Sequence, residues 1–312
     1  MRKLIKIRLA NPRVLRIFFV VTTACPYACR YCPDELHLGK NKTIDLDELE
    51  TFFRKFSDRP LVVNLTGGEC TQHSQFEDII KLLRKLNIKV GVDTNSVRTV
   101  RFYKEFGMLA DVWNVTLHPS QHTLDLEKIQ VLTKHSYVVV YVMMDNEHWD
   151  TSVSWLKQVS QIPDLKVIPL KTINNYGGCD YQGEYTPEQN EFLLNTPNVV
   201  TLTPSRLAEL KGTHSYLLDT DGIGTYDNGD EEILDYNMII KRGENNFYGW
   251  QCVAGNESLN INADESVVWA NCGIKSYAHF RDVDPEELKI PVTCNRVQCY
   301  CGADVRSTKE RK

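Results

Sequence analysis

Apolar and polar positions along the first two thirds of the chain follow two alternating patterns. Short runs that are almost entirely apolar predict strands buried on both faces, and the segments between them repeat apolar residues at helical spacing. The predicted strands are 15–21, 61–65, 90–93, 112–117, 137–144 and 165–170. The predicted helices are 46–56, 76–86, 97–110, 124–133, 151–159 and 187–194. Such an alternation predicts a parallel sheet with right-handed crossovers.

Six strand–helix units are too few to close an eight-stranded barrel. We therefore expect an α/β fold built as a partial (β/α)6 TIM-like barrel, with a doubly wound open sheet as the alternative. Further along the chain the helical period is lost, and five cysteines follow Trp250. The expected organisation is a core over 1–175, the barrel end and a connecting region over 176–249, and a small cysteine-rich α+β extension over 250–312.

Composition narrows the choice of environment and partner. The chain has 312 residues, of which 42% are apolar, enough for a full core. Its formal net charge of −5 gives no overall attraction to nucleic acid, although a local basic groove would not show in that sum, so nucleic acid is not excluded. No apolar run reaches the roughly 18 residues of a membrane span, so we expect a cytoplasmic protein without a membrane partner. Ten cysteines in that reducing compartment indicate metal binding.

Three of the cysteines, Cys25, Cys29 and Cys32, lie on one short segment after the first predicted strand. Thiolates are soft ligands that suit zinc or iron–sulfur clusters. A cubane of four irons takes four cysteinates, so a loop that supplies three leaves one iron open to an outside ligand. The alternative is a zinc knuckle, which normally closes with a fourth ligand at short spacing.

Polar residues and glycines follow several of the predicted strands, where the carboxyl ends of a parallel sheet should bring them together around the cysteines. Gly67 and Gly68 would let the backbone approach a ligand closely, and the Glu69 carboxylate can accept a bond from an ammonium group. The further residues at these ends are Thr66, Asp93, Thr94, Asn95, Ser96, Thr116, His118, Leu170 and Lys171.

This order of elements resembles that of the radical S-adenosylmethionine (radical SAM) enzymes, over roughly residues 15–175. The spacing of the three cysteines matches, and the aromatic Tyr31 precedes the last of them. The resemblance implies that Cys25, Cys29 and Cys32 hold a [4Fe-4S] cluster whose open iron binds SAM. It also implies a SAM site that includes Tyr31, with Gly67, Gly68 and Glu69 holding the methionine amino group. Thr94, Asn95 and Ser96 stand where the family usually has Thr-Asn-Gly. Thr116 would face the ribose or the carboxylate of SAM, and Leu170 would lie near the adenine.

The later cysteines flank a predicted hairpin whose turn lies at 262–265. They are Cys252, Cys272, Cys294, Cys299 and Cys301. This pattern resembles the SPASM and Twitch domains of radical SAM enzymes, which implies a second, auxiliary [4Fe-4S] cluster. The preferred ligands are Cys252, Cys272, Cys299 and Cys301, and Cys294 is able to replace either of the last two. A structural zinc site made of the same residues is the alternative.

Other residues with possible chemistry have simpler interpretations. Cys70 and Cys179 are expected to be ordinary buried thiols, with a role near SAM still open for Cys70 because it follows Glu69. His118 is either a proton donor or acceptor near the substrate or a hydrogen-bonded structural histidine. Asp304 is expected to help seat the auxiliary loop.

The resemblance implies an enzyme that receives an electron from an external donor such as flavodoxin or ferredoxin. It would cleave SAM to methionine and a 5′-deoxyadenosyl radical and take a hydrogen atom from a peptide, a protein or a small metabolite. The auxiliary cluster would accept the electron left on the substrate. The alternative is a non-catalytic iron–sulfur or zinc protein that binds nucleic acid or a protein partner. With 14 residues upstream of the first predicted strand, we expect no peptide-recognition domain before the barrel.

Overall fold

The computed structural model describes residues 2–9, 13–174, 181–210, 222–234, 236–299 and 301–312. Its main sheet has eleven strands in the order β15-β14-β13-β2-β4-β5-β6-β7-β8-β9, with β3 paired to β2 outside that path. Their bounds are β2 (Leu15–Ala24), β3 (Leu38–Asn41), β4 (Leu61–Gly67), β5 (Lys89–Thr94), β6 (Val112–Leu117), β7 (Tyr137–Met144), β8 (Leu165–Lys171), β9 (Val199–Val200), β13 (Ser258–Ile261), β14 (Val267–Trp269) and β15 (Ser276–Tyr277). From β2 to β8 the strands in this order run parallel.

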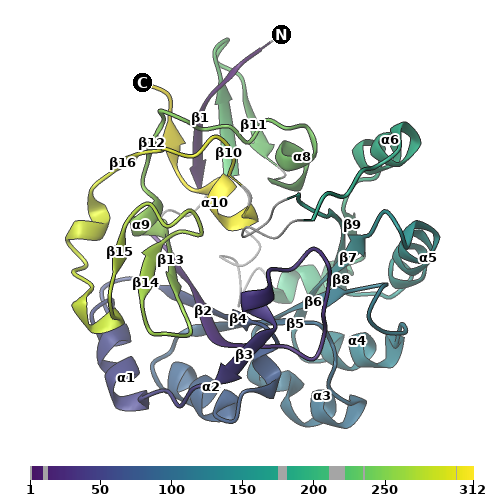
Figure 1. Cartoon of the computed structure of the whole chain (residues 1–312), viewed down its shortest axis with the longest axis horizontal. Coiled ribbons are helices and arrows are strands. Elements are labelled where there is room, and N and C mark those ends of the chain that lie inside the picture. The colour runs from purple at the N-terminus through teal and green to yellow at the C-terminus, as the bar shows by residue number, and fades with distance from the viewer. Residues whose placement is uncertain (1, 10–12, 175–180, 211–221, 235, 300) are drawn as a thin grey trace.

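Six helices connect these strands and cover the outside of the arc that the strands form in Figure 1. They are α1 (Leu46–Arg54), α2 (Phe76–Lys85), α3 (Val100–Phe106), α4 (Leu126–Thr133), α5 (Trp149–Val159) and α6 (Pro187–Asn195). Local sequence explains where they begin. The Asp45 side chain caps α1 by accepting bonds from two backbone N–H groups, and Leu49, Phe52 and Phe53 are buried on one face of that helix.

The prediction of an α/β fold with a parallel sheet is confirmed, and all six predicted strand–helix units are present in the predicted order. The largest difference in bounds is at α3, which was expected over 97–110. Ser96 has a left-handed φ of 59°, and Thr99 caps the helix at the N–H of Phe102, so the helix begins at Val100. A separate 3-10 turn over Gly107–Leu109 ends that segment.

A second sheet, which the sequence did not predict, joins segments far apart in the chain. Its six strands have the order β11-β10-β1-β17-β12-β16. Their bounds are β1 (Leu4–Leu9), β10 (Gly222–Tyr226), β11 (Glu231–Leu234), β12 (Gln251–Cys252), β16 (Val292–Thr293) and β17 (Lys309–Glu310). Strand β1 pairs antiparallel with both β10 and β17, and in Figure 1 this sheet lies on the open side of the arc, beside α8 (Tyr236–Lys241) and α10 (Gly302–Arg306).

The expected separate extension over 250–312 needs a correction. The predicted hairpin is present as β13 and β14, but β13 pairs parallel with β2 and therefore continues the main sheet. Leu259 and Ile261 are fully buried and join the main core, which is why this hairpin docks on β2. The same segment also supplies β12, β16 and β17 to the second sheet. Residues 250–312 are thus part of both sheets.

Candidate active site

A cavity of about 560 Å³ is bordered by the parallel strands, by α8 and by α10. At the carboxyl ends of the strands it is lined by Cys25, Cys29, Tyr31, Cys32, Gly67, Gly68, Thr94, Asn95, Thr116, His118 and Leu170. At the amino ends it is lined by Arg16, Val62, Val112, Tyr137 and Lys166. The cavity therefore extends along the length of the strands, and most of the predicted site residues meet at one end of it.

The cysteine loop leaves β2 and turns at once, with the Cys32 N–H donating to the Cys29 carbonyl over 2.9 Å. The Cys25 sulfur accepts a bond from the Asn95 side-chain amide at 3.4 Å. Burial raises the pKa of Cys25 and raises that of Cys29 to about 12, so these thiols stay protonated without a cation beside them. A coordinated metal deprotonates such thiols. Three soft ligands on one cavity wall therefore fit a cluster with one open iron.

Gly67 and Gly68 hold the end of β4 tightly against the end of β2. The Gly68 N–H donates to the Thr22 carbonyl at 2.9 Å. A Cβ at Gly67 would come within 2.0 Å of the Thr22 carbonyl oxygen, and one at Gly68 within 2.2 Å of that of Ala24. No side chain fits at either position, so both backbones stay exposed to the cavity beside the cysteine loop.

Glu69 lies differently from the prediction. Its side chain is fully buried, and it is not among the residues that line the cavity. One carboxylate oxygen accepts bonds from the Thr71 N–H and hydroxyl and from the Thr94 hydroxyl at 2.9 Å, and the other accepts from the Asn95 N–H at 2.7 Å. Glu69 therefore ties β4 to the end of β5, and this structure does not offer its carboxylate to a ligand ammonium.

Of the polar cluster after β5, Thr94 and Asn95 line the cavity. Ser96 does not, but its N–H donates to the Thr94 hydroxyl at 3.1 Å and its carbonyl accepts from Lys128 at 2.9 Å. The left-handed φ of Ser96 explains why a glycine is usual at this position in the family that the sequence resembles. Thr116 and Leu170, from β6 and β8, also border the cavity as expected.

His118 is half-buried and lies beside the cysteine loop. Its ring stacks on Tyr31 with 5.9 Å between centroids, and its Nδ1 lies 2.9 Å from the Tyr31 hydroxyl and 3.4 Å from the Cys29 sulfur. Burial lowers the pKa of His118 to about 3, so the imidazole is neutral. This geometry favours the hydrogen-bonded structural histidine. Cys70, also fully buried, donates to the Asp93 carbonyl at 3.0 Å and behaves as the ordinary thiol expected, whereas Cys179 lies outside the described residues.

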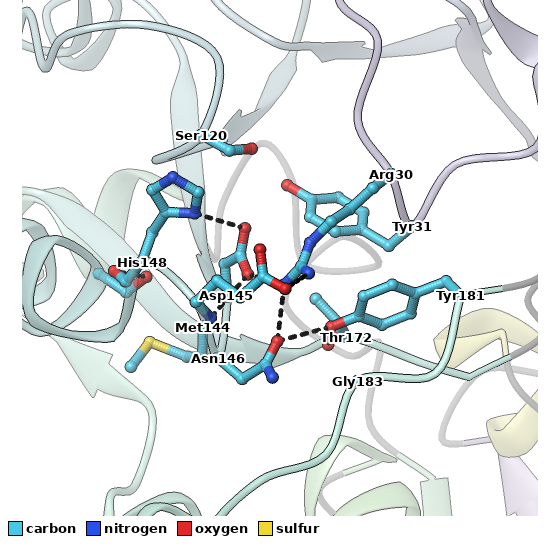
Figure 2. Close-up of polar contacts among 12 residues, drawn as sticks. Arg30, Tyr31, Ser120, Met144, Asp145, Asn146, His148, Thr172, Tyr181 and Gly183 are labelled. Atoms are coloured by element: carbon cyan, nitrogen blue, oxygen red, sulfur yellow. Dashed lines mark hydrogen bonds and ion pairs between the residues drawn. The ribbon is translucent and has the colours of Figure 1, made fainter.

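Sequence reasoning missed the anchor of the cysteine loop, which Figure 2 shows. Arg30 donates to Asp145 and to the Asn146 side-chain carbonyl, each at 2.7 Å. Asn146 also accepts from the Tyr181 hydroxyl at 3.0 Å, and that hydroxyl lies 2.9 Å from Thr172. Asp145 is fully buried directly after β7, so the ion pair fixes the loop to the sheet. The signal available in the sequence was the pair of polar residues, Asp145 and Asn146, that directly follows the fifth predicted strand.

The later cysteines gather from separate segments. Cys252 is in β12, Cys294 follows β16 with its N–H bonded to the Trp250 carbonyl, and Cys299 donates its N–H to the Asn245 carbonyl. Burial, together with the nearby Asp304 carboxylate and Cys252, raises the pKa of Cys272 to about 11 and that of Cys299 to about 12.

Two buried charged residues accompany this second group. Burial opposes the charge of Lys309, but the nearby thiolates of Cys299, Cys252 and Cys294 and the carboxylate of Asp304 raise its pKa. The Asp304 carboxylate accepts from the Asn271 N–H at 2.7 Å, next to Cys272, which agrees with its expected role in seating this region. Cys301, by contrast, lines the main cavity together with Cys25, Cys29 and Cys32.

Within the described part of the chain, no three His, Cys, Asp or Glu side chains are placed to hold a single metal ion. That geometry concerns one ion, whereas a cubane of four irons is larger and spreads its ligands farther apart.

The sequence profile described as the radical SAM superfamily matches residues 19–151. This stretch, less than half of the chain, is similar to a radical SAM domain. The matched stretch includes the cysteine loop, Gly67, Gly68 and the cluster after β5. The match supports the prediction of a radical SAM enzyme.

Two further comparisons agree with the radical SAM assignment. The chain is 32% identical over 121 residues to the GTP 3′,8-cyclase of Photorhabdus laumondii, a match that covers 36% of this chain and 35% of that relative. Among solved structures, Streptococcus suis SuiB bound to S-adenosylmethionine is similar with a TM-score of 0.54 and 12% identity, over 88% of this chain and 65% of SuiB. Native anSMEcpe with bound AdoMet and Cp18Cys peptide has a TM-score of 0.52 and 13% identity, over 88% and 80%. At these identities the structures show a shared fold.

Proposed function

We propose that this chain holds a [4Fe-4S] cluster and SAM at the carboxyl end of the cavity and takes a hydrogen atom from a substrate bound deeper in the same cavity. The observation that carries this proposal is the convergence of Cys25, Cys29 and Cys32 with Gly68 and Asn95 on one cavity. When bound, the cluster and SAM supply reductive cleavage to methionine and a 5′-deoxyadenosyl radical.

The chain's own residues would bind the cluster and SAM, orient them and enclose them. Cys25, Cys29 and Cys32 would hold the cluster, and the Arg30–Asp145 ion pair keeps their loop in place. The exposed backbones of Gly67 and Gly68 and the side chains of Thr94, Asn95 and Thr116 offer hydrogen bonds to SAM. The apolar residues Met143 and Leu170, with the buried Tyr31, line the cavity and exclude water from it.

The proposal includes a second [4Fe-4S] cluster held by Cys252, Cys272, Cys294 and Cys299. This ligand set replaces Cys301 of the sequence-based choice with Cys294, because the charges of Cys294 and Cys252 act on the same neighbours while Cys301 borders the main cavity. Four protein ligands leave no iron open, so this cluster would accept the substrate's electron. An external donor such as flavodoxin or ferredoxin would reduce the first cluster.

The six parallel strands from β2 to β8 would form the partial (β/α)6 barrel, since they follow an arc with helices outside. No helix within the described ranges is long and apolar enough to cross a bilayer. A cytoplasmic location is part of the proposal.

For the substrate we propose a peptide or protein, or a small molecule. Crystal structures of SuiB bound to precursor peptide SuiA and of anSMEcpe with a peptide support the first choice. The curated relative is named for GTP, which supports the second. The chain spans about a third of that relative and 65% of SuiB, so neither substrate transfers directly. A cavity of about 560 Å³ admits a small ligand or one segment of a peptide.

The test is SAM cleavage by the reconstituted protein. After anaerobic reconstitution with iron and sulfide and reduction by dithionite, we expect 5′-deoxyadenosine and methionine to form slowly even without substrate. A non-catalytic iron–sulfur or zinc protein would release neither product. Chromatography with mass detection quantifies both.

A further inference from the structure

Arg16 is a buried arginine that forms no ion pair with a described residue. It is the second residue of β2, lies at the amino end of the cavity and is 9% exposed. Its terminal nitrogens Nη1 and Nη2 are both buried, and neither has a hydrogen-bond partner among the described residues. A guanidinium remains protonated in proteins, and a buried charge without a partner is strongly unfavourable.

The surroundings add positive charge and little that neutralises it. Arg306 of α10 and Lys166 of β8 line the same cavity, and the charge of Arg306 acts unfavourably on Arg16. The carboxylate that acts favourably is Glu257, but its two oxygens accept from the N–H and the hydroxyl of Thr308, each at 2.7 Å. Arg16 and Glu257 form no ion pair within 4.0 Å.

The carboxylate that does line the cavity, Asp93, is also occupied. Asp93 accepts bonds from the side-chain amides of Asn64 at 2.6 Å and Asn114 at 2.8 Å. Burial raises the pKa of Asp93. The cavity is therefore lined by the cationic side chains of Arg16, Lys166 and Arg306, and the buried Nη1 and Nη2 of Arg16 have no hydrogen-bond partner among the described residues, which is the chemistry of an anion site.

We propose that Arg16, in a cavity that Arg306 and Lys166 also line, binds a carboxylate or phosphate group of the substrate at the amino end of the cavity. The planar guanidinium fork matches both groups and can donate two parallel bonds to either. The bound anion would supply hydrogen-bond acceptors for Nη1 and Nη2 of Arg16.

The place of Arg16 in β2 separates this site from SAM. Arg16 precedes Ala24, at the start of the cysteine loop, by eight positions, which is roughly 26 Å of extended strand. SAM bound at the cysteines would leave the Arg16 end of the cavity free. The inference rests on the proposed function in this respect, because it takes the hydrogen-donating end of the substrate to lie near the cysteines. The substrate is then elongated, with its anionic group at the far end.

The experiment compares anions on the anaerobically reconstituted full chain. Melting temperature and calorimetric titration are measured with inorganic pyrophosphate in one arm and glutarate in the other, against chloride at equal ionic strength. We expect one of the two to raise the melting temperature well above chloride, and the arm that does so distinguishes phosphate from carboxylate.

Variants locate the effect. Arg16→Met should melt higher than the wild type without anion, because it no longer buries a charge that lacks an ion pair, and should weaken anion binding by about tenfold or more. Arg16→Lys should keep part of the binding. The matched control, Arg101→Met on the exposed surface of α3, should keep all of it.

Three results would overturn the proposal: no anion-specific rise in the wild type, an equal rise in Arg16→Met, or an Arg16→Met that melts lower or fails to fold, which would make Arg16 a structural partner. SAM cleavage is measured on the same wild-type preparation. Absent cleavage with intact anion binding counts against the proposed function, and the reverse counts against the anion site.

Discussion

The two cysteine groups of this chain are assembled in opposite ways. Cys25, Cys29 and Cys32 come from one loop, held by Arg30 on one side and by the ends of β4 and β5 on the other. Cys252, Cys272, Cys294 and Cys299 come from separate segments around a buried lysine. The first group can therefore be recognised from the local sequence, whereas the cysteines of the second group come together only when both sheets have formed.

The largest expected effect distinguishes the two cysteine groups by iron content and by SAM cleavage. Replacing Cys25, Cys29 and Cys32 with Ala should lower the iron content from about eight to about four per chain and abolish SAM cleavage, because only the first group serves SAM. Iron analysis and 5′-deoxyadenosine yield measure the two outcomes. Cys70→Ala, at a buried thiol in neither group, is the control that should keep all the iron. Full iron in the triple variant would refute the assignment of the first group.

Single replacements test which cysteines belong to the second group. Cys294→Ala should lose about four irons and still cleave SAM, yet form little product once a substrate is known. Cys301→Ala should keep the iron, since Cys301 lines the main cavity. The opposite pattern would restore the sequence-based set with Cys301. Zinc in place of the second set of irons would make the group a structural clamp.

Gly68 tests how closely the first group depends on the end of β4. An added methyl group would meet the Ala24 carbonyl at 2.2 Å and the Leu36 carbonyl at 2.9 Å, both backbone atoms. Gly68→Ala should therefore lower the free energy of unfolding by about 1–3 kcal/mol and weaken SAM binding, with the second group's iron unchanged. Gly229→Ala, in an exposed hairpin turn with nothing within 4 Å, should leave SAM binding intact. Denaturant titration measures the change in unfolding free energy, and a SAM binding assay shows whether each replacement affects SAM binding.

Glu69→Gln distinguishes a ligand contact from a brace. The carboxylate accepts four bonds from Thr71, Thr94 and Asn95, and an amide places a donor where one of them needs an acceptor. We expect a loss of about 1–3 kcal/mol in unfolding free energy, with SAM affinity falling because Asn95 is displaced. A weaker SAM affinity at unchanged stability would instead point to direct contact with the ammonium.

The smallest effect is a gain. Ser96 holds a left-handed φ of 59°, which costs a residue with a side chain about 1 kcal/mol relative to glycine. Ser96→Gly should raise the free energy of unfolding by up to about 1 kcal/mol and leave both iron sites loaded. Asn87, with a φ of 57°, is the control, since asparagine tolerates this conformation and Asn87→Gly should gain less. A loss of stability in Ser96→Gly would show that the serine side chain contributes more than its backbone costs.

Much of the fold could be predicted because its signals are local. The strands 112–117 and 137–144 agree with β6 and β7 at both ends, since the first is mostly apolar and the second is a continuous apolar run. The residues after the strand ends line the cavity, as the geometry of parallel sheets requires.

The rest depends on contacts between distant segments. Nothing near Arg16 in the sequence reveals that its Nη1 and Nη2 lack a partner among the described residues, because the charged residues that act on it, Arg306 and Glu257, are more than 200 positions away. The role of Glu69 was missed for a related reason: its acceptors are used by Thr94 and Asn95, on the neighbouring strand's end. The membership of the second cysteine group likewise requires β16 and β17 to be in place.

The pairing of β1 with β17 has a consequence for the timing of assembly. Lys6 lies opposite Glu310, so this part of the second sheet waits until some 300 residues have been made, roughly 15 to 60 s at ordinary rates of translation. The cysteine loop leaves the ribosome early in that interval, with the part of the cavity wall that α10 supplies still missing. A cluster delivered to the nascent chain would meet an open, oxygen-accessible half-site, so we expect cluster insertion to follow completion of the chain.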